Sequence, residues 1–324
     1  MIGMSYDRTM TNEKLPLELQ HPPERDACIS FDEASHTYTV TRDGKPEVIG
    51  GEKNPVRTVT SFAKHYFSEF DANKIVNNYY ASWASNPQSK YHALIQSVLS
   101  QSGAAQEDAK QAIKSLWETN RDEASAAGTK MHADAETMMN GLVAPDTPEM
   151  QLLSEWRHTF QPHMRWVPER TEWPLWYADA RCNNRVLTAG MLDLLMRSET
   201  HDVYALVDWK RCNPNPKFKG GPPNLLGPAG NLRYHPGYGK PPLQEVEDSD
   251  FGKYAMQLNV LAKILRDRYH IDVEDRMFLV QLHPDLEEAH TVQVPSYKEA
   301  TESLFRVELE RYVQALMKEQ FVSD

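Results

Sequence analysis

Cysteine and long hydrophobic runs are both scarce in this chain of 324 residues. Its three cysteines lie far apart and form no CxxC pair, which excludes a disulfide framework and a four-cysteine metal cluster and is typical of a reducing compartment. No apolar run approaches the roughly 18 residues that a membrane helix needs, and no signal peptide opens the chain. We therefore expect an intracellular protein without a membrane partner. Composition does not distinguish the cytoplasm, the nucleus and an organelle matrix.

Positive charge is also in short supply. The chain has 35 Lys and Arg residues against 46 Asp and Glu, a formal net charge of −11. Nucleic-acid affinity rests largely on basic groups that meet phosphates, so proteins that bind nucleic acid usually have an excess of Lys and Arg. The local potential at a groove matters more than the net charge, however. Any binding of nucleic acid by this chain therefore requires basic residues gathered in one place.

The order of the predicted elements indicates an α/β protein. Residues 1–27 are polar and contain proline, as expected of a loose N-terminal tail. Residues 28–120 contain a predicted β-hairpin and then helices, in which apolar and aromatic residues recur at helical spacing. Residues 121–324 alternate between β-rich runs and helices, with a long Gly- and Pro-rich loop at 213–249. We expect this last part to form a mixed central sheet flanked by helices, preceded by an N-terminal helical region.

Two features of the N-terminal half are expected to be structural. The hairpin around Asp43 and Gly44 is interpreted as a small hairpin outside the chemistry. The Trp and Tyr residues of the following helices have the spacing of a buried face, so we expect a core rather than a platform for stacked bases.

The hairpin predicted over residues 185–211 places charged side chains on an apolar surface. Asp208 and Lys210 point to one face of their strand, whereas Val207 and Trp209 point to the other. An acid and a base among apolar neighbours are costly unless they pair with each other or bind something. A simple ion pair on an edge strand is the alternative interpretation.

Asp193 lies in an equally apolar run on the preceding strand. If four residues form the turn, Ser198 faces Val203, and this register sets Asp193 opposite Asp208 with Cβ atoms about 5 Å apart. Two carboxylates at so short a distance repel each other unless a cation lies between them. A hard divalent ion such as Mg²⁺ or Mn²⁺ is the natural occupant. The pattern therefore predicts a metal site on this hairpin.

Further motifs lie in order around the spacing Gly190-x-x-Asp193 and Asp208-x-Lys210. Residues 128–136 read GTKMHADAE, Glu172 opens a strand before the hairpin, and residues 254–258 read YAMQL. In this order they resemble the motifs of the RecB-like branch of the PD-(D/E)XK nuclease superfamily, with its helical GTxxHxxxE and QL motifs. The resemblance spans roughly residues 121–265, and similar members are the RecB nuclease domain and the mitochondrial genome maintenance exonuclease.

The resemblance implies a restriction-endonuclease-like core that hydrolyses phosphodiester bonds with the help of a metal ion. It also implies the ligands of the Mg²⁺ or Mn²⁺ ion. These would be His132, Asp193, Asp208 and the backbone carbonyl of Trp209.

Other site residues follow from the same resemblance. Lys210 would orient the attacking water or stabilise the developing negative charge. Gln257 would position the substrate backbone or the water, and an ordinary surface amide is its alternative. Glu136 and Glu172 would be either supporting residues or ligands of a further metal. The chain departs from some members in two ways: three cysteines cannot hold an iron–sulfur cluster, and the QL motif continues with Leu261 instead of an aromatic residue.

The stretch from Trp209 to Gln244 contains no Asp or Glu. Basic groups along it can meet phosphates, and interleaved aromatic rings can stack unpaired bases. We therefore expect a loop that clamps the substrate, with a neutral spacer or a loop for a partner protein as the alternatives. The residues expected to bind nucleic acid are Lys217, Lys219, Arg233, Tyr234 and Lys240.

These features predict a Mg²⁺- or Mn²⁺-dependent deoxyribonuclease, an exonuclease that acts on single-stranded or flap-like DNA ends. RNA as substrate and a protein partner are left open. The alternatives are a non-catalytic nucleic-acid-binding or scaffold protein on the same fold, a partner-activated endonuclease, and a hydrolase of small phosphoesters. The mode of cutting, its polarity and the oligomeric state are not determined by the sequence.

Overall fold

The computed structural model describes residues 14–20, 24–51, 54, 56–214 and 237–322. The chain forms two compact units, one of residues 68–130 and one of all residues before and after them. The boundary at residue 130 lies within helix α5 (Gln106–Met139). The sequence places this boundary at residue 120 instead. The difference arises because α5 continues through that position without a break.

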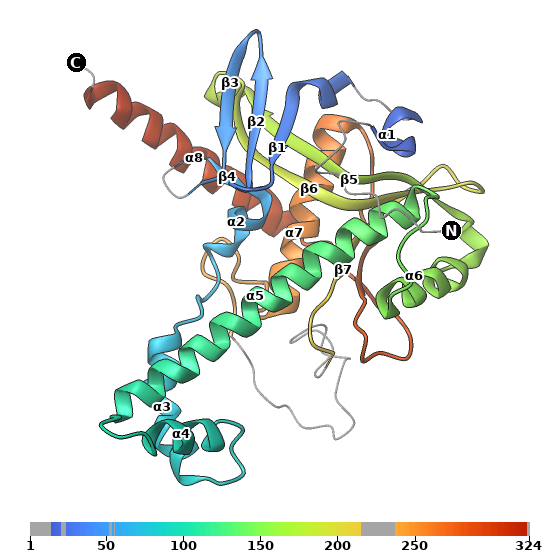
Figure 1. Cartoon of the computed structure of the whole chain (residues 1–324). Helices are drawn as coiled ribbons and strands as arrows, with labels where there is room; N and C mark the ends of the chain where they lie inside the picture. The colour runs from blue at the N-terminus through green and yellow to red at the C-terminus, as the bar shows by residue number, and fades with distance from the viewer. Residues whose placement is uncertain (1–13, 21–23, 52–53, 55, 215–236, 323–324) are drawn as a thin grey trace. The chain divides into compact units, whose positions relative to one another are not determined.

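The larger unit is built on a mixed sheet of six strands (Figure 1). Antiparallel pairs join β5 to β6, β6 to β7 and β8 to β9, and parallel pairs join β4 to β6 and β7 to β8. The strands are β4 (Arg57–Thr58), β5 (Trp166–Asp179), β6 (Arg185–Ser198), β7 (Tyr204–Lys210), β8 (Met277–Gln281) and β9 (His290–Gln293).

Helices cover both faces of this sheet. Leu206 of β7 packs in a core with α2, α7 and α8, whereas its neighbour Val207 packs in a second core with α6 and the end of α5. Because neighbours along a strand point to opposite faces, the two cores lie on opposite sides of the sheet. The predicted α/β class, with a mixed sheet flanked by helices, is confirmed. These helices are α2 (Val59–Lys64), α6 (Pro148–Thr159), α7 (Asp250–Ile264) and α8 (Lys298–Val322).

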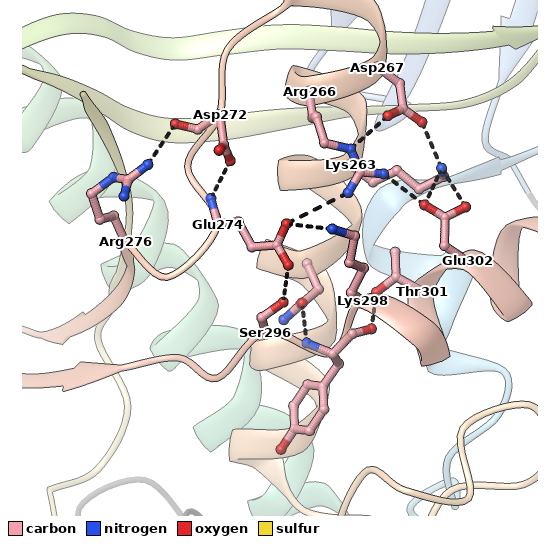
Figure 2. Close-up of polar contacts among 12 residues, drawn as sticks. Lys263, Arg266, Asp267, Asp272, Glu274, Arg276, Ser296, Lys298, Thr301 and Glu302 are labelled. Carbon is pink, nitrogen blue, oxygen red and sulfur yellow. Dashed lines mark hydrogen bonds and ion pairs between the residues drawn. The ribbon is translucent and has the colours of Figure 1, made fainter. Parts of the chain in front are cut away.

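Ion pairs join α7 to α8 (Figure 2). Lys263 of α7 is 7% exposed, and its Nζ lies 2.6 Å from Asp267 and 2.8 Å from Glu302 of α8. Arg266 contacts the same two carboxylates at 2.8 and 2.7 Å. Asp267 belongs to η4 (Leu265–Tyr269), a π-helical turn that continues α7. A buried ammonium is costly without such partners, so this network fixes how the two helices pack.

A second, three-stranded sheet of β1 (Ile29–Asp32), β2 (Thr37–Arg42) and β3 (Lys45–Ile49) contains the predicted hairpin. Its buried residues belong to the same core as residues of β5 and β6. The hairpin is therefore part of the larger unit and is not grouped with the helices that follow it.

The described part of residues 1–27 is not a loose tail. It contains α1 (Pro16–Gln20) and the 3₁₀ turn η1 (Glu24–Cys28). Asp26 of η1 accepts hydrogen bonds from the guanidinium of Arg170 at 2.6 Å and from the indole of Trp173 at 2.7 Å. These long-range bonds attach a polar segment to β5, which its local composition does not reveal.

The smaller unit consists of α3 (Ala72–Ser85), α4 (His92–Leu99) and α5 up to residue 130. Its core contains Tyr80 and Tyr91, with Trp83 and Trp117 packed against it. The Trp117 indole donates a hydrogen bond of 2.8 Å to the Tyr91 hydroxyl. The prediction that aromatic residues of these helices form a core is confirmed for Tyr80, Trp83 and Trp117, whereas Tyr79 is exposed. In the described part of the chain, no helix is long and apolar enough to span a membrane.

Candidate metal centre

The register of the β6–β7 hairpin is the one that the sequence predicts. The Ser198 N–H bonds to the Val203 carbonyl at 3.0 Å, and Leu194 pairs with Val207. The next position sets Asp193 opposite Asp208. The backbone ladder ends there, and the N–H of Trp209 donates instead to the side chain of Asp193, Oδ2, at 2.7 Å.

Asp193 lies where one edge of β6 changes partner. Antiparallel β7 pairs with this edge from Leu194 to Arg197, and parallel β4 pairs with it at Thr188 and Ala189. Among the described residues, no strand pairs with residues 190–193 on this edge. Side chains from other elements therefore reach the strand at this gap.

Gly190 makes the close packing near this gap possible. A Cβ at this position would lie 2.5 Å from Cβ and Cγ2 of Val59 on α2. Such distances are far below a van der Waals contact, so only glycine fits without a shift of α2. The glycine of the Gly190-x-x-Asp193 motif thus serves a packing need.

Three potential metal ligands converge at the gap from α5, β5 and β6. Nδ1 of His132 lies 3.2 Å from Oε1 of Glu172 and 3.6 Å from Oδ2 of Asp193. Ligand atoms of all three residues lie within 4.8 Å of one another. Glu172 has a φ of 39°, in the left-handed region that is rare for residues other than Gly, Asn and Asp. Strain of this kind costs about 1–3 kcal/mol and is concentrated at functional sites.

Asp208 and Lys210 form an ion pair beside this cluster. Nζ of Lys210 lies 2.5 Å from Oδ2 of Asp208, and Nε2 of Gln257 on α7 donates to Oδ1 at 3.4 Å. The ammonium also lies 5.0 Å from the ring centroid of Tyr254, one turn before Gln257. The residues of the D-x-K motif and of the helical QL motif are therefore brought together.

Burial and neighbouring charges shift the pKa values of the site residues. Burial lowers the pKa of His132, but the charge of Asp193 and the hydrogen bond with Glu172 raise it to about 9. Burial opposes the charge of Lys210 as well, yet Asp208 and Asp193 raise its pKa above the usual value. With all five groups ionised, two cations and three carboxylates have a formal net charge of −1 in a poorly solvated place.

The carboxylates respond to that excess of negative charge. Burial and the neighbouring charge of Asp193 raise the pKa of Asp208 to about 6. Burial also raises the pKa of Asp193, against the charge of His132. A divalent cation would relieve this repulsion, and imidazole nitrogen and carboxylate oxygen are donors that such ions accept.

The set of clustered residues differs from the ligand set implied by the resemblance. Glu172 replaces Asp208 in the group of three, because Asp208 is turned toward Lys210 and Gln257. Trp209 directs its N–H at Asp193, and its indole packs at 5.2 Å against Trp156 in the second core. Glu136 is buried one turn after His132 and does not belong to the group.

Tyr38 of β2 is a site residue that sequence reasoning missed. It is buried, and burial together with the charges of Glu172 and Asp193 raises the pKa of its phenol well above the usual value. The expectation that the first hairpin lies outside the chemistry stays a prediction, although this residue of the hairpin lies near the cluster. The alternation of residues along the strand predicts that Tyr38 points inward, but it does not predict which residues Tyr38 contacts.

The predicted clamp is described only at its two ends, residues 209–214 and 237–244. Lys217, Lys219, Arg233 and Tyr234 lie outside the described residues. Lys240 is exposed, and its N–H bonds to the Tyr66 carbonyl at 2.7 Å.

Comparison with known proteins adds little to this geometry. No protein-family model matches the chain, and no curated protein matches it. A solved structure described as "Crystal structure of SSO0001" aligns with a TM-score of 0.23 and 13% identity, over 51% of this chain and 56% of the other. A common fold does not follow from similarity at that level.

Proposed function

We propose that this protein is a metal-dependent nuclease of the PD-(D/E)XK type, which hydrolyses phosphodiester bonds of DNA. The favoured substrate is a single-stranded or flap-like end. One observation carries the proposal: His132, Glu172 and Asp193 cluster within 4.8 Å, next to the ion pair of Asp208 and Lys210. These residues come from four separate stretches of the sequence. A chance group of charged residues on the surface would not need such convergence.

The donor set fits Mg²⁺ or Mn²⁺. His132, Glu172 and Asp193 would hold the ion, with Asp208 as a neighbouring carboxylate. Bound there, the ion would supply a Lewis acid for the phosphate and lower the pKa of a water ligand. His132 must give up its proton to become a ligand, so uptake of the ion should release protons.

Lys210 acts as a fixed positive charge in this proposal. Asp208 and Asp193 hold its pKa above the ordinary value, so it stays protonated at neutral pH and cannot accept a proton from water. Its ammonium would stabilise negative charge that develops on the phosphate, a contribution worth about 10²–10³-fold in comparable sites. Gln257 would keep Asp208 turned toward the ammonium.

A cleavage assay on end-labelled single-stranded, flap-bearing and duplex DNA, and on RNA, tests the proposal. Reactions contain Mg²⁺, Mn²⁺ or EDTA, and compare the wild type with Lys210→Ala and Lys298→Ala. We expect metal-dependent cleavage that falls at least 10²-fold in Lys210→Ala. Lys298 lies outside the cluster and pairs with Glu274, so Lys298→Ala should cut like the wild type. A folded protein that binds Mn²⁺ but cleaves none of these substrates would contradict the nuclease and favour a scaffold protein.

A further inference from the structure

A cleft of about 720 Å³ lies where the turn between β5 and β6 meets the turn between β2 and β3. Side chains from η1 and η4 complete its wall. Its volume falls in the range of about 300–1,000 Å³ that is typical of small-ligand sites. It is separate from the metal cluster, because none of its lining residues belongs to that cluster.

The cleft carries positive charge in a chain whose net charge is −11. Its five bases and two acids give a formal charge of +3. Glu47 pairs with Arg42 and Arg185, while the described residues place no acid within ion-pairing distance of Arg25, Lys45 or Arg268. The bases are Arg25, Arg42, Lys45, Arg185 and Arg268, and the acids are Asp43 and Glu47.

Aromatic rings hold two of the guanidinium groups in place. The guanidinium carbon of Arg25 lies 3.7 Å from the ring centroid of Trp176, and that of Arg268 lies 4.2 Å from the ring centroid of Tyr177. The Nε atoms of both arginines and of Arg42 are buried, and no described residue accepts a hydrogen bond from them. A buried N–H without an acceptor is costly, so the hydrogen-bonding capacity of these three guanidinium groups is incompletely used.

We propose that this cleft is a second anion site, which binds the phosphate groups of a nucleotide or of a nucleic-acid strand. The planar guanidinium fork matches phosphate oxygens in pairs, and rings that fix the fork reduce the entropy lost on binding. A formal charge of +3 favours a ligand with several negative charges over a single carboxylate. Only the choice of nucleic acid as the source of phosphate rests on the proposed nuclease; the anion chemistry does not.

The distance to the metal cluster suits a strand that occupies both places. On β5, Trp176 follows Glu172 by four residues, and on β6, Arg185 precedes Asp193 by eight residues. At about 3.3 Å per residue these intervals correspond to about 13 Å and 26 Å. A strand of several nucleotides with its scissile bond at the cluster therefore has phosphates at this range.

Equilibrium binding in EDTA tests the site without any cleavage. Fluorescence anisotropy of a labelled single-stranded 20-mer is measured at several salt concentrations for the wild type, for Lys45→Gln/Arg268→Gln and for Lys45→Glu. Lys45 is exposed at the first position of β3, so the last variant changes charge with little risk to the fold. We expect roughly tenfold weaker binding for the double variant and a salt slope smaller by about 1–2. Binding of all variants like the wild type, or no binding of the 20-mer or ADP by the wild type, would overturn the proposal.

A matched control removes two positive charges elsewhere. Arg165 pairs with Glu199 and Lys298 pairs with Glu274, and neither lines the cleft. Arg165→Gln/Lys298→Gln should keep the affinity and the salt slope of the wild type, and equal losses in both double variants would contradict a local site. Competition by ADP distinguishes the sources: ADP that displaces the 20-mer indicates a nucleotide site, and failure to compete indicates a strand.

The outcomes for the two proposals are distinguishable. Loss of binding in Lys45→Gln/Arg268→Gln without any cleavage by the wild type leaves the anion site standing and removes the nuclease. Metal-dependent cleavage by the wild type, together with unchanged binding in all variants, would support the nuclease and overturn the anion site.

Discussion

The N–H of Trp209 donates a hydrogen bond of 2.7 Å to Oδ2 of Asp193 across the β6–β7 hairpin. The carboxylate takes the place that a backbone carbonyl would have in a continuing ladder. This bond orients Asp193 toward the gap in the sheet edge, where its Oδ2 also lies 3.6 Å from His132. A site carboxylate is thus held by the same hydrogen bonding that builds the strand.

Replacement of Asp193 by Asn should separate metal binding from folding. The Asn oxygen can accept the same bond from Trp209, while the net charge of the cluster rises from −1 to 0. We expect Mn²⁺ affinity to fall at least about 100-fold, because a ligand charge is lost. The free energy of unfolding by urea in EDTA should equal or exceed that of the wild type, because a buried carboxylate has been neutralised. Unchanged Mn²⁺ affinity by calorimetry would show that Asp193 is not a ligand.

The two candidate glutamates should behave differently. Glu172 lies in the group of potential ligands, so Glu172→Gln should weaken Mn²⁺ binding by about 10–100-fold. Glu136 is also buried but lies outside that group, which makes Glu136→Gln the matched control. Mn²⁺ titrations of both variants decide the matter. A larger loss in Glu136→Gln would reverse the assignment.

Gly190 and Val59 should be coupled in stability. Gly190→Ala brings a methyl group against α2 and should cost about 1–3 kcal/mol. Val59→Ala alone leaves a small cavity and should also destabilise. In the double variant, Val59→Ala removes Cγ1 and Cγ2, which are two of the three Val59 atoms that the new Cβ of residue 190 would contact. The double variant should therefore lose less than the sum, by at least about 0.5 kcal/mol, in urea unfolding. Strict additivity would mean that the contact does not decide the need for glycine.

Local pattern was enough to predict the hairpin that carries Asp193 and Asp208. Side-chain alternation and a four-residue turn together specify a single register, since a slip by one residue would turn every apolar side chain to the wrong face. The helix that bears Gln257 follows from its apolar spacing in the same way. These are short-range properties of the chain.

The composition of the cluster depends on long-range packing. Glu172 reaches His132 through an unusual backbone conformation, and Tyr38 arrives from a hairpin more than a hundred residues earlier in the sequence. Hydrophobic periodicity in the sequence predicts neither of these two contacts. Likewise, the anchoring of Asp26 depends on Arg170 and Trp173, which lie far along the chain. The boundary at residue 130 was missed because a continuous helix leaves no composition change there.

Glu47 offers a test of pH-dependent stability away from the cluster. Its carboxylate accepts hydrogen bonds from Arg42, from Arg185 at 3.1 Å and from the N–H of Val186 at 3.0 Å, and so ties β3 to the start of β6. Burial alone would raise its pKa, but these donors lower it below the ordinary 4.5. At pH 7, Glu47→Gln should lower the free energy of unfolding by about 1–2 kcal/mol, as expected for partly solvated bonds to charged groups.

The sign of the pH effect follows from the lowered pKa of Glu47. Below its folded-state pKa the folded and unfolded chains bind the same proton, so the stabilisation is absent. Above the unfolded-state value it is complete. The difference between wild type and Glu47→Gln should therefore be constant above about pH 5 and shrink as the pH falls below 4.5. Urea unfolding from pH 3.5 to 7, with Glu33→Gln on the exposed β1–β2 turn as control, measures it. The control should stay within about 0.5 kcal/mol of the wild type throughout. A difference for Glu47→Gln that persists undiminished at the lowest pH would mean that the ionised carboxylate does not hold β3 to β6.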